Sequence, residues 1–285
     1  MAEWMAGALY APREGATSEG TVALLCDSRL PCYHLPRPLG NCMRVLVISD
    51  IHANLVALET VLAHAGSYDA VWCLGDLVGY GPNPNECVAR VRALPGPICL
   101  VGNHDKAVLG EIDLNVFNLD ARVAIAWTQR EVSRETLAYL RALPEAQQAG
   151  DFTLVHGSPR QPVWEYILDR FIARENFPLI TTPWCLVGHT HTPVIYKEIS
   201  PDGDCDEEAP DYRRPRSLNG ERLIINPGSV GQPRDNNPHA AYAILDTGAR
   251  MWEYRRILYD VAETQNRMRV ARLPERLASR LAYGW

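Results

Sequence analysis

Short apolar runs alternate with stretches of helical spacing along the first hundred residues of the folded part of the chain. The runs are rich in β-branched and aliphatic residues, which predicts buried strands at 45–48, 70–74 and 98–101. Between them, apolar side chains recur every three or four residues and predict helices over 54–65 and 85–92. Because strands that alternate with helices form a parallel sheet, this part of the chain is predicted to fold as an α/β domain.

The rest of the chain continues this mixture of helices and strands. Residues 106–148 are predicted to be mostly helical, and further helices are predicted at 164–172 and 260–271. The segment 201–220 is acidic, then basic and rich in proline, which is typical of a loop that is either disordered or a surface excursion. The remaining strands are predicted at 152–155, 185–187, 194–199 and 223–225, and in a hairpin over 240–257.

Residues 1–42 lack any such pattern. They are rich in Gly, Pro, Ala and Ser, and they contain no basic start followed by the apolar core of a secretory signal. We expect a loosely ordered N-terminal extension over 1–42 and a folded domain over 43–285. The alternative is an N-terminal element that packs on the domain.

The composition of the chain argues against several classes of protein. A net charge of -6 and a pI near 5.8 argue against a general nucleic-acid or membrane-surface binder, which would need a basic face. No apolar run approaches the roughly 18 residues that a membrane span requires. The 8 cysteines include no C-x-x-C pair and several lie in apolar runs, which is typical of reduced core thiols in a cytoplasmic protein.

Residues of metal-ligand type follow five of the predicted strands. They include five of the 8 histidines, and the whole set is Asp50, His52, Asp76, Asn103, His104, His156, His189 and His191. The carboxyl ends of parallel strands meet at one edge of a sheet, so these side chains are expected to lie close together. Carboxylate, imidazole and carboxamide ligands without thiolate suit Mn²⁺, Fe, Zn²⁺ or Co²⁺ better than a structural zinc. A carboxylate shared between two ions would hold a dinuclear hydrolytic centre.

The motifs D-x-H, G-D, G-N-H-D, H-G and G-H-T-H, in this order, resemble those of the calcineurin-like metallophosphoesterases and span most of 44–192. The resemblance implies a four-layer α-β-β-α sandwich, in which two facing mixed β-sheets are flanked by helices. It also implies two divalent transition-metal ions, with Mn²⁺ or Fe favoured and Zn²⁺, Co²⁺ or Ni²⁺ as alternatives. By motif position, Asp76 would bridge the two ions, one of which would be held by Asp50, His52 and His191 and the other by Asn103, His156 and His189.

The same resemblance implies hydrolysis of a phosphate ester by a metal-bound hydroxide. His104 would donate a proton or a hydrogen bond to the leaving oxygen, and Asp105 would orient His104. The serine/threonine phosphatases and the bacterial dinucleoside tetraphosphatases of this superfamily carry an Arg in the G-D loop, where this chain has Tyr80. We therefore expect a phosphodiesterase acting on a small nucleotide-like substrate, with a phosphomonoesterase or a dinucleoside polyphosphate hydrolase as alternatives.

Four residues outside these motifs are expected to line the substrate side of the cleft. The segment N-P-G-S-V-G-Q-P-R-D resembles that of the small bacterial phosphodiesterases and contributes Asn226, Ser229 and Arg234, and Arg160 is the fourth. The alternative for the segment is a Gly and Pro turn with a surface Arg. The arginines of the C-terminal tail, including Arg280, are expected on a solvated helix face.

The expected partner is a small phosphate ester, with neither a membrane nor a stable nucleic-acid partner, and a homo-oligomer is left open. The alternative of another class is a catalytically weak interaction scaffold, because some members of the superfamily have lost metal ligands. The complete set of ligand-type residues in this chain argues against that alternative.

Overall fold

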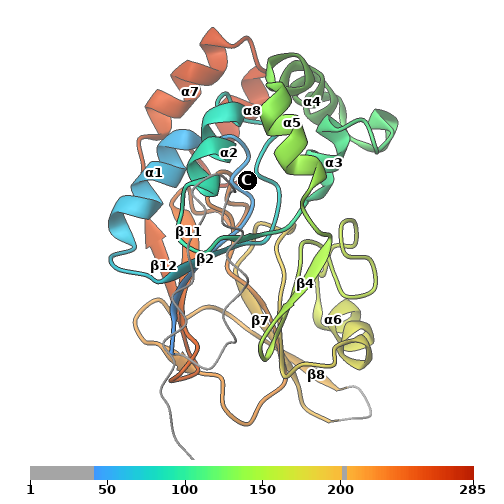
Figure 1. Ribbon diagram of the computed structural model, residues 1–285, viewed down its shortest axis with the longest axis vertical. Coiled ribbons are helices and arrows are strands. Elements are labelled where there is room, and N and C mark those ends of the chain that lie inside the picture. Colours follow the sequence, from blue (N-terminus) through green and yellow to red (C-terminus); the bar gives the residue numbers. More distant parts are fainter. Residues whose placement is uncertain (1–41, 201–203) are drawn as a thin grey trace, which may run out of the picture. The chain divides into compact units, whose positions relative to one another are not determined.

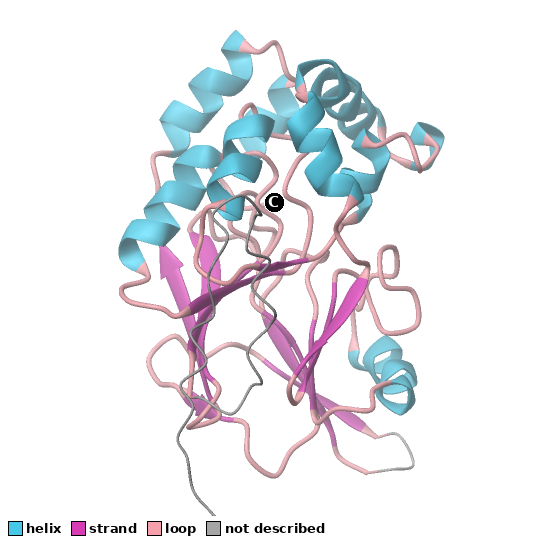
Figure 2. Cartoon of the chain, viewed as in Figure 1, coloured by secondary structure: helices cyan, strands magenta, loops and turns pink. Residues whose placement is uncertain are grey.

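The computed structural model describes residues 42–200 and 204–285, and it contains two six-stranded mixed β-sheets (Figure 1, Figure 2). The spatial order of the first sheet is β3 (Ile98–Cys99), β2 (Ala70–Cys73), β1 (Arg44–Ile48), β11 (Ala240–Asp246), β12 (Met251–Ile257) and β9 (Arg216–Ser217). The order of the second is β4 (Ala146–Ala149), β5 (Phe152–Val155), β6 (Trp184–Leu186), β10 (Leu223–Asn226), β7 (Val194–Glu198) and β8 (Cys205–Glu208). Each sheet combines parallel and antiparallel pairs.

Helices cover the outer faces of both sheets. The first sheet shares an apolar core with α1 (Leu55–His64), α2 (Pro84–Arg92), α3 (Asn103–Val108), α4 (Leu119–Glu131), α5 (Arg134–Arg141) and α7 (Val261–Val270). A short 3-10 turn η1 (Leu114–Val116) precedes α4, and α8 (Glu275–Arg280) packs against α7. The second sheet is covered by α6 (Arg170–Asn176) and the turn η2 (Phe177–Leu179). The expected four-layer sandwich is confirmed (Figure 1).

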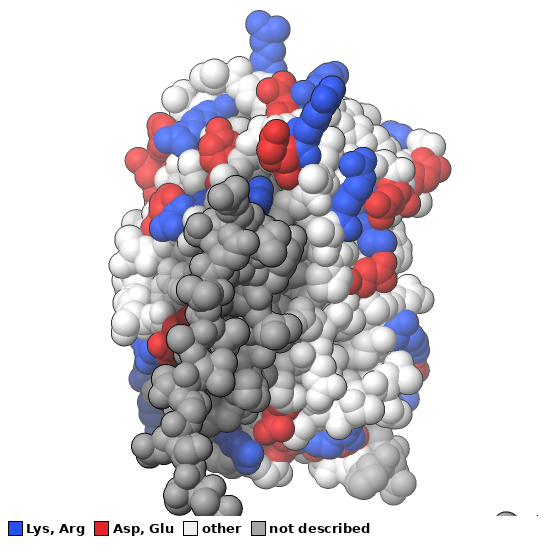
Figure 3. Space-filling model, viewed as in Figure 1, with Lys and Arg blue, Asp and Glu red and all other residues white. Residues whose placement is uncertain are grey.

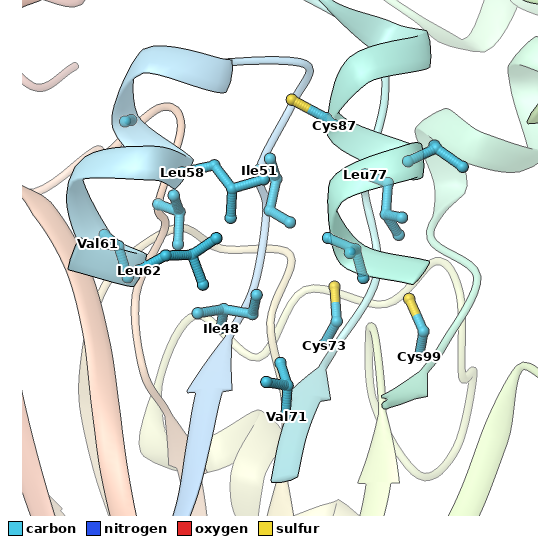
Figure 4. Close-up of a cluster of buried hydrophobic side chains, with 14 of the residues drawn as sticks. Ile48, Ile51, Leu58, Val61, Leu62, Val71, Cys73, Leu77, Cys87 and Cys99 are labelled. Carbon is cyan, nitrogen blue, oxygen red and sulfur yellow. The ribbon is translucent and has the colours of Figure 1, made fainter. Parts of the chain in front are cut away.

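The alternation of side chains along β1 shows how the layers hold together. Val45 and Val47 point into the core between the two sheets, where they join residues such as Leu154 of β5. Leu46 and Ile48 point the other way, into the core under the helices (Figure 4). All four β1 side chains are fully buried, and each such burial contributes about 1.5–3 kcal/mol. One strand therefore ties the helical layer to the second sheet.

Cysteine side chains are part of the core beneath the helices. Cys73, Cys87 and Cys99 lie among the aliphatic residues of β1, β2, α1 and α2 (Figure 4). Burial raises the pKa of the Cys87 and Cys99 thiols, which keeps them protonated. The six cysteines in the described ranges are all free, and five are buried, so the prediction of reduced core thiols is confirmed for those five.

The predicted helix over 164–172 is wrong for residues 164–169 and agrees with the structure only over 170–172. The chain is irregular over 163–168, and α6 begins at Arg170, because the Asp169 carboxylate accepts hydrogen bonds from the backbone amides of the first turn. The residues before Asp169 are thereby left free to contact the loops at the edge of the sheet.

The predicted surface loop over 201–220 is also wrong in part, because it contains β8 and β9. The strand β4 lies in a region predicted to be mostly helical. All three strands stand at the edges of their sheets and are largely exposed, so they lack the apolar alternation by which strands are recognised.

The predicted extension over 1–42 lies outside the described residues except for Cys42, so it and the domain boundary at 43 stay predictions. In the described part of the chain, no helix combines the length and the apolar character of a membrane span. On the face drawn in Figure 3, acidic and basic side chains are intermixed over the helices rather than gathered into a basic field.

Candidate metal centre

The polar residues that follow β1, β2, β3, β5 and β6 meet at the carboxyl ends of these strands. The strands β1, β2 and β3 run parallel to one another, as do β5 and β6. Backbone hydrogen bonds join the loops: the Asp50 amide donates to the Gly75 carbonyl at 3.0 Å, and the His52 amide donates to the Asp76 carbonyl at 2.9 Å. The loops of the second sheet are joined in the same way, because the Gly188 amide donates to the His156 carbonyl at 2.8 Å.

One group of potential ligands has donor atoms that all lie within 4.8 Å of one another, and it consists of Asp50, His52, Asp76 and His191. His52 Nε2 lies 3.0 Å from His191 Nε2 and 3.5 Å from Asp76 Oδ2. His191 Nε2 lies 3.3 Å from Asp50 Oδ1. All four side chains are buried. A divalent cation placed among two imidazole nitrogens and two carboxylate oxygens would satisfy all four atoms.

A second group shares one member with the first. Its donor atoms also lie within 4.8 Å of one another and belong to Asp76, His156 and His189. His156 Nε2 lies 3.4 Å from Asp76 Oδ2 and 3.2 Å from Asn103 Oδ1. Asp76 Oδ2 is therefore within 3.5 Å of a histidine from each group. This is the position from which a carboxylate can bridge two ions.

Two carboxylate oxygens in these groups have no hydrogen-bond partner among the described residues. They are Asp50 Oδ1 and Asp76 Oδ2, and both are fully buried. A buried anionic oxygen without a partner is strongly destabilising, so proteins retain such atoms mainly where a cation compensates them. Together with the mixture of nitrogen and oxygen donors, these unpaired oxygens show that the residues present fit divalent metal ions.

Backbone carbonyls fix the orientation of the four histidine rings in these groups. Each ring places one nitrogen 2.5–3.2 Å from a carbonyl oxygen, in the pairs His52 Nδ1 with Val78, His156 Nδ1 with Leu74, His191 Nδ1 with Gln232 and His189 Nε2 with Trp164. A carbonyl only accepts, so that nitrogen carries a proton, and in the neutral ring the other nitrogen keeps a lone pair. The rings are thereby held in the tautomers that bind metal.

Burial and neighbouring charge set the protonation states. Burial lowers the pKa of His189 to about 3 and that of His104 to about 4, so both are neutral at pH 7. Burial would raise the pKa of Asp76, but the charge of His156 lowers it well below its ordinary value. The Asp76 carboxylate in turn outweighs the effect of burial on His156 and raises the pKa of that ring to about 9. The centre concentrates negative charge and attracts cations.

The backbone is strained at the ligand positions. Positive φ angles of 49–66° occur at five of them, Asp50, His52, Asp76, His189 and His191. This conformation is rare outside glycine and costs on the order of 1 kcal/mol or more for each residue. The Asp76 side chain also needs a glycine beside it, because a Cβ at Gly102 would overlap Asp76 Oδ1. The strain is concentrated where the polar side chains converge, which is typical of functional sites.

His104 lies at the edge of the centre. Its backbone amide donates to Asp76 Oδ1 at 2.9 Å, and its ring lies between Tyr80 and Phe117, with centroids 4.3 and 5.2 Å away. The ring is buried, and His104 Nδ1 has no hydrogen-bond partner among the described residues.

The contacts of Asp105 differ from the prediction that its carboxylate orients the His104 ring. Its two carboxylate oxygens accept hydrogen bonds from the backbone amides of Val78, at 3.0 Å, and Gly102, at 2.9 Å. The carboxylate therefore joins the loops that follow β2 and β3. It acts on His104 only through the backbone, because a nearby pair of amides offers better-placed donors than the ring.

The prediction that Asn226 and Ser229 line the substrate side of the cleft also needs correction. Both are buried, at 1% and 0% exposure, and their polar atoms are used within the protein. Asn226 Nδ2 donates to the Gly188 carbonyl at 2.7 Å, and Ser229 Oγ donates to the Asp50 carbonyl at 2.8 Å. They support the ligand-bearing loops from beneath.

The two arginines expected at the substrate differ in their partners. Arg160 forms ion pairs with Glu165 and Glu175, each at 2.5 Å, so its charge is already compensated. Arg234 donates to Gln232 Oε1 at 2.9 Å, and within the described ranges it has no carboxylate partner within 4.0 Å. The Arg234 backbone amide donates to the His191 carbonyl at 3.4 Å, so Arg234 lies beside the centre. Burial and the charge of Arg234 are the two largest causes of the lowered pKa of His191.

Three aromatic residues border the centre, and two of them, Trp164 and Tyr166, were not expected there. The ring of Tyr166 stacks on His189, with centroids 3.6 Å apart and an interplanar angle of 21°. Trp164 contributes its carbonyl to the same histidine, and Tyr80 packs on His52 at 4.7 Å. The predicted helix over 164–172 concealed Trp164 and Tyr166, because residues two positions apart on a helix do not share a face.

The comparisons with known proteins agree with this geometry. The calcineurin-like phosphoesterase superfamily domain matches residues 43–250. An uncharacterised protein of Methanocaldococcus jannaschii is 36% identical over 84% of this chain and 98% of its own length. Phosphodiesterase YfcE of Escherichia coli is 26% identical over 72% of this chain and 88% of its own.

A solved structure extends the agreement to the fold. The crystal structure of a metallophosphoesterase from Sphaerobacter thermophilus is 49% identical to this chain, with a TM-score of 0.80. The match covers 86% of this chain and 100% of that one. The resemblance inferred from the five motifs is confirmed, and the chain belongs to the calcineurin-like phosphoesterase superfamily.

Proposed function

We propose that this phosphoesterase hydrolyses a phosphodiester in a small nucleotide-like molecule with the help of two divalent metal ions. The observation that carries the proposal is the position of Asp76 Oδ2 between two groups of buried donors. Two divalent ions supply Lewis acidity and lower the pKa of water when they are bound. The residues proposed for one ion are Asp50, His52, Asp76 and His191, and those for the other are Asp76, Asn103, His156 and His189.

The identity of the ions is part of the proposal. Mn²⁺ or Fe are favoured, and Zn²⁺, Co²⁺ and Ni²⁺ are alternatives, because imidazole, carboxylate and carboxamide donors suit these ions. The cytoplasm is the proposed compartment. The five buried, unpaired cysteines support it, because thiols persist where the environment is reducing.

His104 is proposed to donate a hydrogen bond or a proton to the leaving oxygen. Its ring packs against the rings of Tyr80 and Phe117 and has a nitrogen without a partner in the described part of the chain. Burial lowers its pKa to about 4, so at pH 7 the neutral ring would act mainly as a hydrogen-bond donor, and any share of proton transfer would need the ring to be protonated when substrate binds. Arg234 is proposed to hold the phosphate, since its guanidinium has only neutral partners.

A diester is favoured over a monoester because little positive charge surrounds the centre. Tyr80 is 6% exposed and packs on His104 and His52, so the loop after β2 supplies an uncharged side chain. One guanidinium matches the single negative charge of a diester better than the two charges of a monoester. The complete set of buried donors argues against a scaffold without catalysis.

A dinucleoside polyphosphate is the second candidate, and the position of Arg280 favours it. The Asn236 amide donates to the Gly284 carbonyl at 2.8 Å, which holds the C-terminal segment beside the Arg234 loop. Burial, together with the charge of Arg234, lowers the pKa of Arg280 to about 10. Arg280 is half-buried, in contrast to the solvated position expected for it, and together with Arg234 it would supply two guanidinium groups for a longer chain of phosphates.

The test combines metal analysis with hydrolysis of bis-p-nitrophenyl phosphate and p-nitrophenyl phosphate in the presence of Mn²⁺. We expect about two ions per chain and faster turnover of the diester. In Asp76→Asn both the metal content and the diester turnover should collapse, whereas Asp206→Asn, the same change at an exposed position, should leave both intact. Diester turnover that persists in metal-depleted Asp76→Asn would refute the proposal.

A further inference from the structure

Aromatic rings border the centre. Phe117 contacts His104 at 5.2 Å and Trp164 at 5.6 Å between ring centroids, and Tyr166 stacks on His189 at 3.6 Å. We call Phe117, Trp164 and Tyr166 the aromatic wall. Trp164 and Tyr166 are 39% and 40% exposed, so both side chains are partly accessible from solvent.

The wall is built by two segments that are far apart in the sequence and meet at the centre. Phe117 follows η1 and packs on the ring proposed to face the leaving oxygen. Trp164 and Tyr166 come from the irregular stretch before α6, and both contact His189, one through its carbonyl and one through its ring. The wall therefore runs from the leaving-group side of the centre to the second group of donors.

The stretch that carries Trp164 and Tyr166 is rigidly held. The carboxylate of Glu165, which lies between them, accepts from Ser158 Oγ at 2.6 Å, Asn176 Nδ2 at 3.0 Å and the guanidinium of Arg160 at 2.5 Å. Two partly exposed aromatic side chains are thus fixed in place beside a catalytic centre. Preorganised aromatic surfaces bind planar ligands without the entropic cost of ordering a loop.

We propose that the aromatic wall is a subsite for the nucleobase of the leaving group, so that the substrate is a phosphodiester that carries a base on its leaving oxygen. The inference rests on the proposed function, because His104 defines the leaving-group side. Aromatic side chains stack on any nucleobase, since every base has a π face. A leaving group attached near His104 would extend along Phe117 toward Trp164.

The test is calorimetric binding of AMP and of ribose 5-phosphate to the Mn²⁺-loaded full-length protein. The two ligands share the phosphomonoester and the ribose, and they differ in the base. We expect AMP to bind at least about tenfold more tightly than ribose 5-phosphate, which is within the range measured for base stacking on aromatic side chains. The preference should fall to about twofold or less in Trp164→Ala and persist in Trp164→Phe, which keeps an aromatic face.

Phe171→Ala is the matched control, because it truncates a 57% exposed aromatic side chain of α6 that is not part of the wall. It should keep the preference for AMP. Equal binding of the two ligands to the wild type, or an unchanged preference in Trp164→Ala, would overturn the inference.

Turnover of bis-p-nitrophenyl phosphate, measured in parallel, separates the two proposals. Turnover without a preference for AMP overturns the nucleobase subsite and leaves the proposed hydrolysis standing. A preference for AMP that depends on Trp164, without turnover of the diester, supports the subsite and overturns the proposed hydrolysis.

Discussion

Glu165 anchors the loop that positions His189, so the substitution Glu165→Gln should affect both stability and metal binding. The carboxylate is 15% exposed and accepts hydrogen bonds from Ser158, Asn176 and Arg160. Glutamine keeps the shape and one acceptor oxygen but removes the charge. The substitution therefore isolates the ionic contribution of Glu165 from its packing.

The magnitude follows from the pKa of Glu165. Burial would raise this pKa, but the hydrogen bonds from Arg160, Ser158 and Asn176 lower it from 4.5 to about 2. That difference corresponds to an upper limit of about 3 kcal/mol at pH 7. Arg160 is 39% exposed, so solvent screens part of the interaction, and we expect Glu165→Gln to lower the free energy of unfolding by about 1–2 kcal/mol.

The stabilisation by Glu165 decreases as the pH falls. The pKa in the folded state is lower than in the unfolded state, so the stabilisation is fully present above about pH 4.5 and is lost as the pH falls through about 2. Urea unfolding of metal-free wild type and Glu165→Gln at pH 7 and pH 3 measures the effect. The difference between the two proteins at pH 3 should be less than about half of that at pH 7.

Glu175→Gln is the matched control for this experiment, since Glu175 pairs with the same arginine but is 52% exposed. It should change the free energy of unfolding by less than about 0.5 kcal/mol. Calorimetry with Mn²⁺ should show weaker binding of one of the two ions to Glu165→Gln by about tenfold, because the Trp164 carbonyl orients His189. A stability difference that is the same at both pH values, combined with unchanged metal affinity, would refute this reasoning.

Three further substitutions test other parts of the centre. His104→Asn should lower kcat about 10²–10⁴-fold for diesters with an alkoxide leaving group. The decrease should be smaller for diesters that release p-nitrophenolate, because this leaving group needs less protonation, and steady-state kinetics measures both effects. Gly102→Ala should reduce the metal content, because the added Cβ overlaps Asp76 Oδ1. Gly110 has a positive φ and open space around its Cβ position, so Gly110→Ala should lower the stability without loss of metal. Metal analysis and urea unfolding distinguish the two variants. Ser229→Ala should lower the free energy of unfolding by about 1–3 kcal/mol in urea titrations and leave KM unchanged, since Ser229 is buried beneath the centre.

The sequence predicts the central strands and the ligand-type residues, because both leave local patterns. The sequences of β1 and β2 are apolar and end in a turn, and the residues that follow them carry side chains of metal-ligand type. The edge strand β4 leaves no such pattern, since three of its four side chains are exposed. Parallel pairing of β1 with β2 then brings the ligand side chains together without further information from the sequence.

The role of a residue cannot be predicted in this way when two possible hydrogen-bond partners compete for it. Asp105 follows His104 in the sequence, which favours a direct contact, but the folded loops place the amides of Val78 and Gly102 closer to its carboxylate. The stretch 163–168 has helical spacing, but Asp169 caps α6 and the Trp164 carbonyl binds His189 instead of continuing a helix. In both cases a hydrogen bond across the fold outweighs the local preference.

The same principle explains why the segment N-P-G-S-V-G-Q-P belongs to the centre although it contributes no ligand. Ser229 Oγ and the Gly231 amide both donate to the Asp50 carbonyl, at 2.8 and 3.0 Å, and the Val230 amide donates to the Ser49 carbonyl at 3.0 Å. Asp50 has a φ of 52°, a conformation that an isolated chain avoids. Three hydrogen bonds to consecutive carbonyls can offset a strain on the order of 1–3 kcal/mol. A segment almost 180 residues away therefore sets the direction of the first ligand, and its sequence is constrained by the backbone of Asp50 rather than by contact with a substrate.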